Sequence, residues 1–129
     1  MNDEITNEQL RLQIAPALGW KFSRLNECSS NAFAWRPRGD ETDDAFPMLD
    51  GNEINWGDCP NCPEDIAAAM GLAALMAKTN PVGIRLYRNM AWVSVSDHRY
   101  VLTTIASGSA DKPARAICLA FLAWKQAQS

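Results

Sequence analysis

Cys59 and Cys62 are the two residues whose types and spacing come nearest to a chemical motif in this chain. They lie in the stretch WGDCPNCPEDIAAAM, and each is followed by a proline. Such spacing is typical of a thiol–disulfide pair, or of two of the four ligands of a zinc site. A zinc site needs two more ligands, and the chain offers only Cys28, Cys118 and His98, with no second close pair. We interpret the pair as loop cysteines before a helix, with no cofactor, and keep a metal site as the weaker alternative.

A second set of residues has the chemistry to bind an anion. Arginines and aromatic rings recur in the region 85–99, and the start of the last predicted helix adds two basic side chains. Guanidinium groups bind phosphates through paired hydrogen bonds, aromatic faces stack on bases, and helix starts attract anions. The alternative is a set of solvated side chains on an exposed sheet. The candidate ligand-binding residues are Arg85, Tyr87, Arg88, Trp92, His98, Arg99, Lys112 and Arg115.

His98 is the only histidine of the chain, and it lies in a predicted turn beside Asp97. Catalysis by a histidine usually needs a nucleophile or a second acid–base group at a recognisable position. No serine or cysteine in a nucleophile motif lies near His98. We therefore predict no catalytic residues and no enzymatic activity.

The charges are segregated along the chain, whose net charge is −3. Between Gly39 and Lys78 there is no lysine or arginine. Such an acidic segment repels a nucleic-acid backbone, so we expect no general DNA binding. Together with Trp56, a lone tryptophan in polar surroundings, the segment could instead contact a partner protein. Its acidic residues are Asp40, Glu41, Asp43, Asp44, Asp50, Glu53, Asp58, Glu64 and Asp65.

The size and composition favour one globular domain over residues 1–129, because 47% of the residues are hydrophobic. No apolar run approaches the length of a membrane span. The first residues, MNDEITNEQ, are polar and unlike a secretory signal. Four cysteines are too few for a disulfide scaffold. We therefore expect a cytoplasmic protein with reduced thiols.

Capping and periodicity signals predict three helices, over about 6–19, 63–78 and 113–126. Thr6 and Gln9 have the spacing of a capping box at the first helix. The predicted buried residues of the second helix are Ile66, Ala69, Met70, Ala73, Met76 and Ala77. Those of the third are Ile117, Cys118, Phe121 and Trp124.

Alternating apolar and polar residues predict five strands, joined by short polar turns. The first two form a hairpin, and the last three form consecutive hairpins with antiparallel pairing. Residues 38–62 are predicted to form a long acidic loop between the two groups. The predicted strands cover about 20–23, 32–36, 83–87, 90–96 and 100–106.

In their order, these elements resemble the phage ABA sandwich domain, a family of small proteins from tailed phages and prophages. Four motifs carry the resemblance: LGW at 18–20, DIAAAM at 65–70, MAWVSVS at 90–96 and ADKPARAICLAFLAW at 110–124. The family favours patterns such as D-I-A-A-A-W and T-A-P-x-A-I-C-x-A-A-L. Before the aspartate it usually has serine or threonine, where this chain has Cys62-Pro63-Glu64. The resemblance implies a phage origin and an α/β/α sandwich with a central, mainly antiparallel sheet of about five strands and three helices.

These observations favour two classes of function over a third, a metal-dependent or thiol enzyme that would use Cys59 and Cys62. The first is a small non-enzymatic phage accessory protein in the host cytoplasm that sequesters a nucleotide-derived immune signal, as an anti-defence sponge does. Its ligand would be a cyclic nucleotide or an ADP-ribose derivative, and the site could lie between subunits of a homo-oligomer. The second is an interaction module that binds a host or virion protein through the acidic loop.

Overall fold

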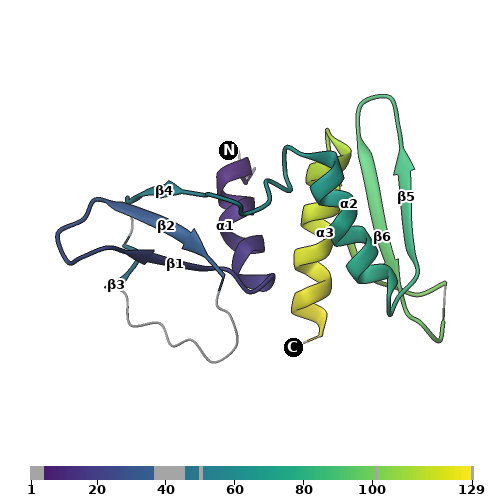
Figure 1. Ribbon diagram of the computed structural model, residues 1–129. Coiled ribbons are helices and arrows are strands. Elements are labelled where there is room, and N and C mark those ends of the chain that lie inside the picture. Colours follow the sequence, from purple (N-terminus) through teal and green to yellow (C-terminus); the bar gives the residue numbers. More distant parts are fainter. Residues whose placement is uncertain (1–4, 37–45, 50, 101, 129) are drawn as a thin grey trace. The chain divides into compact units, whose positions relative to one another are not determined.

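The structure, a computed structural model, describes residues 5–36, 46–49, 51–100 and 102–128. These residues form three helices and two sheets (Figure 1). The mixed helix and strand content agrees with the prediction. Within the described ranges, no helix has the length and apolarity needed to cross a bilayer.

The chain is divided into two compact units. Unit 1 combines Met1–Ile14 with Asn61–Ser129, and unit 2 is Ala15–Pro60. The prediction of one central sheet of about five strands is wrong, because the described strands form separate sheets of four and three strands. Strand pairing is a long-range property, and the sequence shows only where strands occur. That the units act as one domain over residues 1–129 stays a prediction.

α1 (Asn7–Ala17) lies within the predicted range of about 6–19, beginning one residue later and ending two residues earlier. The Gln9 N–H donates to Thr6 Oγ1 at 3.1 Å, and the Thr6 N–H donates to Gln9 Oε1 at 2.9 Å. This reciprocal pair confirms the capping box. Pro16 lies in the last turn, and Gly19 follows the helix with a φ of 94°. Glycine takes this left-handed conformation without strain, which is why the helix ends there.

Unit 2 is built on the predicted hairpin of β1 (Lys21–Arg24) and β2 (Asn31–Trp35). β3 (Phe46–Pro47) pairs antiparallel with β1, and β4 (Glu53–Asn55) pairs parallel with β2. The prediction that 38–62 is one unbroken loop is therefore wrong at these two strands. They are too short to show the alternation by which strands are recognised.

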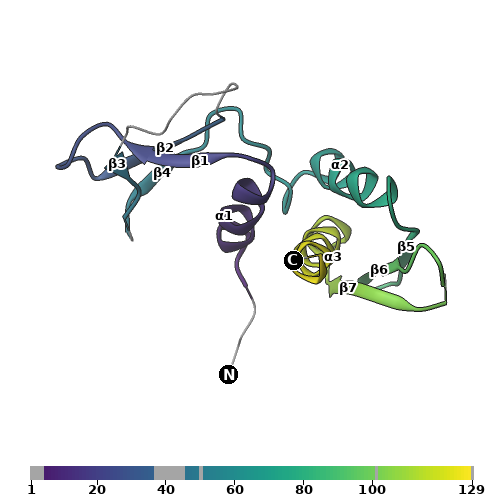
Figure 2. The same cartoon turned by 90° about the horizontal axis from the view of Figure 1, so that it is seen from below.

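α2 (Ile66–Ala77) and α3 (Pro113–Ala127) pack side by side on one face of the sheet of unit 1 (Figure 2). α3 has the predicted bounds to within one residue. The predicted buried residues of α3 are confirmed: Ile117, Cys118, Phe121 and Trp124. α2 begins later than predicted because Asp65 caps it, its Oδ1 accepting a hydrogen bond from the Ala67 N–H at 3.0 Å.

The buried face of α2 is only partly the predicted one. Ala69, Ala73 and Met76 are buried as expected, together with Leu72, whereas Ala77 is exposed. Two further residues predicted to be buried, Ile66 and Met70, are 51% and 47% exposed. The twelve residues of α2 include no charged side chain. A helix that is apolar on every side has no amphipathic pattern from which the buried face could be read.

Three antiparallel strands form the sheet of unit 1: β5 (Val82–Leu86), β6 (Ala91–Ser96) and β7 (Thr104–Ala110). β5 and β6 agree with the prediction to within one residue. β7 begins four residues later than the predicted strand at 100–106 and runs through SGSA, a stretch that the sequence suggests is a loop. The first turn of this meander, between β5 and β6, and the second, between β6 and β7, lie at opposite ends of β6 (Figure 1).

α3 lies directly on β7 because the residues of β7 on that face are small: Ala106, Gly108 and Ala110. A Cβ atom at Gly108 would lie 2.4 Å from the backbone N of Ala120 and 2.5 Å from the carbonyl O of Ala116. Only glycine permits such a close approach of two backbones. The same small residues explain why the sequence does not predict this part of the strand, since strands are recognised by large β-branched and aromatic side chains.

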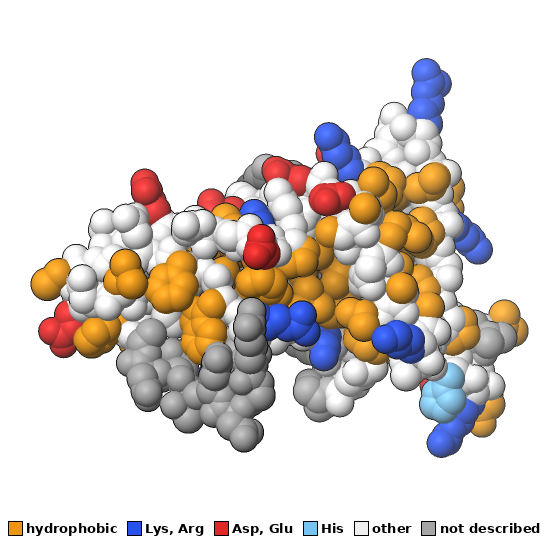
Figure 3. Space-filling model, viewed as in Figure 1, with side chains coloured by type: hydrophobic (Ala, Val, Ile, Leu, Met, Phe, Trp, Pro, Cys, Tyr) orange, Lys and Arg blue, Asp and Glu red, His pale blue; other side chains and the backbone are white. Residues whose placement is uncertain are grey.

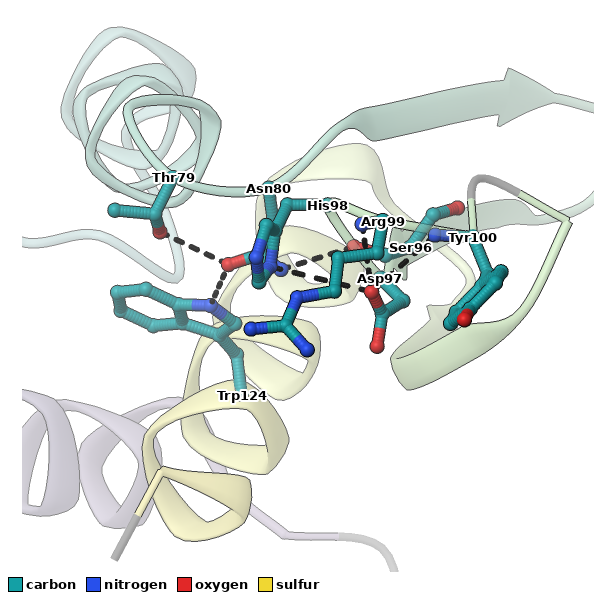
Figure 4. Close-up of polar contacts among 8 residues, drawn as sticks. All are labelled: Thr79, Asn80, Ser96, Asp97, His98, Arg99, Tyr100 and Trp124. Carbon is teal, nitrogen blue, oxygen red and sulfur yellow. Dashed lines mark hydrogen bonds and ion pairs between the residues drawn. The ribbon is translucent and has the colours of Figure 1, made fainter.

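Asn80 connects three elements of unit 1 (Figure 4). Its Oδ1 accepts hydrogen bonds from Trp124 Nε1 at 3.1 Å and from Thr79 Oγ1 at 2.9 Å, and its Nδ2 donates to the Ser96 carbonyl at 3.0 Å. Asn80 is buried, so these bonds satisfy an amide that has little access to water. They fix the end of α2 to β6 and α3.

Candidate functional site

The structure does not bring the predicted ligand-binding residues into one group. Six of them lie either on the open face of the sheet, which is the face away from the helices, or in the two turns of the meander. Because β6 has six residues, the two turns are about 20 Å apart. Lys112 and Arg115 lie at the start of α3. The open face carries Arg85 and Trp92, the first turn carries Tyr87 and Arg88, and the second carries His98 and Arg99.

The open face of the sheet has a small hollow around Arg85 and Trp92, which lie directly opposite each other on β5 and β6. Ser94 and Thr104 complete its lining, and its volume is about 190 Å³. Ligand sites usually have volumes of about 300–1,000 Å³. Trp92 is 44% exposed and has room to stack on one base. The hollow is too small to enclose a whole nucleotide.

His98 and Arg99 lie in a turn that Asp97 stabilises (Figure 4). Asp97 Oδ1 accepts hydrogen bonds from the Arg99 N–H at 2.7 Å and from the Tyr100 N–H at 3.3 Å. The bond from Arg99 is the largest cause that holds the pKa of Asp97 below its usual value. His98 Nδ1 is 3.9 Å from the carboxylate, and its side chain is mostly exposed. The carboxylate therefore holds the turn together.

Arg115 is a buried residue whose guanidinium group is engaged within unit 1. Its Nη2 donates to the Ile5 carbonyl at 2.6 Å, and its Nη1 donates to Asn7 Oδ1. Its Nε is 3.8 Å from the Asp111 carboxylate. Arg115 thus positions the N-terminal segment against the start of α3, and its guanidinium does not line the pocket.

The starts of all three helices contribute to a cavity of about 580 Å³, which we name the helix-start pocket. Its volume is in the range typical of ligand sites. Lys112, one of the predicted binding residues, forms part of its wall. The pocket is lined by Asn7, Pro63, Glu64, Ile66, Lys112, Pro113 and Ala114.

α3 differs from the other helices in how its start is capped. The side chains of Thr6 and Asp65 accept hydrogen bonds from backbone N–H groups at the starts of α1 and α2. The N-cap of α3 is Lys112, and no side-chain hydrogen bond caps this start among the described residues. The first N–H groups of a helix have no partner within it. Ala114 lines the pocket, so its N–H is a donor at this end of it.

Glu64 adds a carboxylate to the wall of the pocket. Asn7 Nδ2 donates to Glu64 Oε1 at 3.1 Å, and Asn61 Nδ2 donates to Oε2 at 2.9 Å. These two bonds hold the pKa of Glu64 below its usual value, and the bond from Asn7 has the larger effect. Burial acts in the opposite direction. The charges of Arg11 and Lys112 also lower this pKa, with a smaller effect. The carboxylate is therefore ionised at neutral pH.

Sequence reasoning does not find Asn7 and Glu64 as residues of one site. Glu64 is 57 positions from Asn7 along the chain, and Arg115 is 108 positions from it. One local signal exists. Asn61 and Glu64 have the three-residue spacing of a capping box, which predicts that Asn61 caps the second helix. The structure shows the side-chain hydrogen bond between these two residues, while Asp65 takes the capping position.

Cys59 and Cys62 lie in the predicted loop, but their side chains are core residues that are 4% and 1% exposed. None of the four cysteines forms a disulfide. Burial and the neighbouring Cys62 raise the pKa of Cys118 to about 12, burial being the larger cause. In the part of the chain that the structure describes, no three histidine, cysteine, aspartate or glutamate side chains form a group that could hold a metal ion.

Trp56, the tryptophan of the acidic segment, packs within unit 2. Its ring meets the edge of the Phe22 ring, with the centroids 5.6 Å apart and the planes at 89°. Glu53 and Asp58 are exposed. Asp40, Glu41, Asp43, Asp44 and Asp50 lie outside the described residues. Binding of a host or virion protein through this segment stays a prediction.

A scan against protein-family models and searches of curated proteins and of solved structures found no match. The resemblance to the phage ABA sandwich domain therefore stays a prediction.

Proposed function

We propose that unit 1 is a non-enzymatic binding module whose helix-start pocket takes a phosphate-bearing, nucleotide-derived ligand. The observation that carries the proposal is the start of α3, which opens on a pocket of about 580 Å³ with Lys112 as its N-cap. Backbone N–H groups and the positive end of the helix dipole favour a negative group there. Lys112 adds a full positive charge. A phosphate at α3 would take the role that side-chain oxygens have at α1 and α2.

Glu64 favours a ligand that carries hydroxyl groups as well as a phosphate. An ionised carboxylate accepts hydrogen bonds from sugar hydroxyls, as acidic residues do with ribose in dinucleotide-binding folds. The same carboxylate repels a bare phosphate. One cation and one anion in the same wall therefore suit a nucleotide better than an inorganic anion.

Pro63, Ile66 and Pro113 supply the apolar part of the lining. Ile66 is 51% exposed, so its side chain is accessible to a bound base. Ligand sites typically combine such apolar walls with a few polar groups that fix the orientation. Phosphate, sugar and base thus each have a matching part of the pocket.

Tight binding without turnover would sequester such a ligand. In a phage protein acting in the host cytoplasm, this is the anti-defence role that the sequence suggests, with cyclic nucleotides and ADP-ribose derivatives as candidates. The proposal replaces the dispersed arginines with the pocket and keeps Lys112 as the principal cation.

Calorimetry of the full chain with cyclic dinucleotides, cyclic trinucleotides and ADP-ribose isomers tests the proposal. Lys112→Ala should weaken binding about tenfold or more, because a hydrogen bond to a charged group contributes about 1.5–3 kcal/mol. Arg85→Ala is the matched control, since it removes the same charge from the open face of the sheet. If Arg85→Ala weakens binding and Lys112→Ala does not, the site lies on the open face.

Glu64→Gln separates the two roles of the carboxylate. The variant should bind the nucleotide more weakly and inorganic phosphate more tightly, because a hydroxyl acceptor is weakened and a repulsive charge is removed. If no ligand of the panel gives heat with the unmodified protein, the proposed function is wrong.

A further inference from the structure

The outward face of α2 is an exposed apolar surface. Met70 is 47% exposed and Leu75 is 37% exposed, and α2 has no charged residue. Figure 3 shows hydrophobic side chains gathered over the surface where α2 and β5 lie. A helix that is apolar on all sides is normally buried on all sides. The outward face of α2 therefore has the composition of a covered surface.

The centre of this face consists of small residues. At about 100° per residue, Ala67, Gly71 and Ala74 lie opposite the buried side of the helix. Met70 and Leu75 lie on its two flanks. A Cβ atom at Gly71 would meet no atom within 4 Å, so the space above it is open. Small central residues allow another helix to come close, and the larger flanking side chains then fill the grooves beside it.

The two ends of the face carry charges of opposite sign. Glu64 and Asp65 directly precede the first residue of α2, and Lys78 directly follows the last. If a second α2 lay antiparallel on the first, Lys78 would meet the acidic end of the other helix at both ends of the contact. The opposite helix dipoles would also be aligned favourably.

We propose that the chain forms a two-fold homodimer in which α2 of each subunit packs antiparallel on the α2 of the other. A two-fold interface needs a surface that is complementary to itself. The α2 face meets this requirement, because its centre is apolar and its acidic and basic ends exchange places under the rotation. A second copy supplies both the apolar centre and the opposite charges at the correct spacing. The dimer does not rest on the proposed ligand.

Sedimentation velocity of the full chain without ligand, from low to high micromolar concentration, tests the dimer. The unmodified protein should sediment as a dimer, and Ala74→Glu should be a monomer because it places two carboxylates at the centre of the interface. Ser107→Glu is the matched control, since it adds the same charge at an exposed position on β7 and should leave the dimer intact. Circular dichroism establishes that each variant is folded.

Two further variants keep the test decisive if Ala74→Glu does not fold. Lys78→Glu should weaken the dimer because it brings like charges together at both ends of the contact. In a Cys28→Ser background, Gly71→Cys should form a disulfide between subunits under mild oxidation, since the register that places Lys78 opposite the acidic end puts the two-fold axis beside residue 71. A monomeric unmodified protein would overturn the proposal, and so would a dimer that neither charge variant weakens.

Discussion

Replacement of Gly108 by alanine should disturb the contact between β7 and α3. The added Cβ would lie 2.4 Å from the N of Ala120, 2.5 Å from the O of Ala116 and 2.9 Å from the carbonyl C of Leu119. All three are backbone atoms, so no change of rotamer can relieve the overlap, and the helix or the strand must move. Overpacking of this kind costs about 1–3 kcal/mol.

A second effect of the Gly108→Ala change partly offsets this cost. Alanine restricts the unfolded chain more than glycine does, and this stabilises the folded state by about 0.4–1 kcal/mol where the backbone suits alanine. Gly108 does not have a positive φ, so the gain applies. Three backbone contacts under 3.0 Å place the overpacking near the upper end of its range. The net loss of stability should therefore be about 2 kcal/mol.

Urea denaturation followed by circular dichroism measures this loss, with Gly83→Ala as the matched control. Gly83 lies on β5 of the same sheet, and a Cβ atom there would approach only the Ser94 Oγ, at 3.2 Å. That side chain can turn away, so the control should change stability by about 0.5 kcal/mol or less. If the Gly108→Ala variant is as stable as the control, α3 does not pack on β7 in this way.

Other variants and reagents test the buried groups and the pocket. Asn80→Leu should cost about 1–3 kcal/mol in the same assay, because the Trp124 indole N–H loses its buried acceptor; an unchanged midpoint would exclude that bond. A thiol-specific reagent should modify the exposed Cys28 in the native protein and leave Cys118 unmodified until unfolding, since burial raises the pKa of Cys118 to about 12. Labelling of Cys118 in the native protein would contradict its burial. The folded pKa of Glu64 lies below the ordinary value of 4.5, so its carboxylate stabilises the fold above pH 4.5 and this stability is lost as the pH falls through the folded pKa. The melting temperature of the Glu64→Gln variant should lose this part of the pH dependence. If the variant and the unmodified protein have the same melting temperature at every pH, Glu64 does not contribute in this way.

The predictions that succeeded rest on signals that act within a few residues. Thr6 caps a helix three positions from Gln9, and Gly19 ends the same helix by its own backbone conformation. The prediction for β7 fails because its small residues, such as Gly108, are needed for the close approach of α3. That approach is a tertiary contact, and the local sequence does not reveal it. The division of the strands into two sheets likewise depends on pairing between distant segments, which propensity does not reveal.

In the candidate site, too, local signals predict residues, whereas contacts between distant segments remain hidden in the sequence. The sequence predicts Lys112 because a helix start is a local feature that attracts anions by itself. Arg88 and Arg99 are close in sequence because they flank the same strand, but the two ends of an extended strand lie far apart in space. Asn7 was missed because nothing in its own surroundings indicates that it contacts Glu64.

The bonds from Arg115 to Ile5 and Asn7 have a consequence for how the protein is made. Unit 1 contains the first and the last parts of the chain, with unit 2 between them. Asn7 leaves the ribosome 108 residues before Arg115, which corresponds to about 5–20 s of synthesis at typical rates of elongation. During that interval the N-terminal segment has no α3 to which it could be fixed. The part of unit 1 that is synthesised first is therefore among the last to reach its final place.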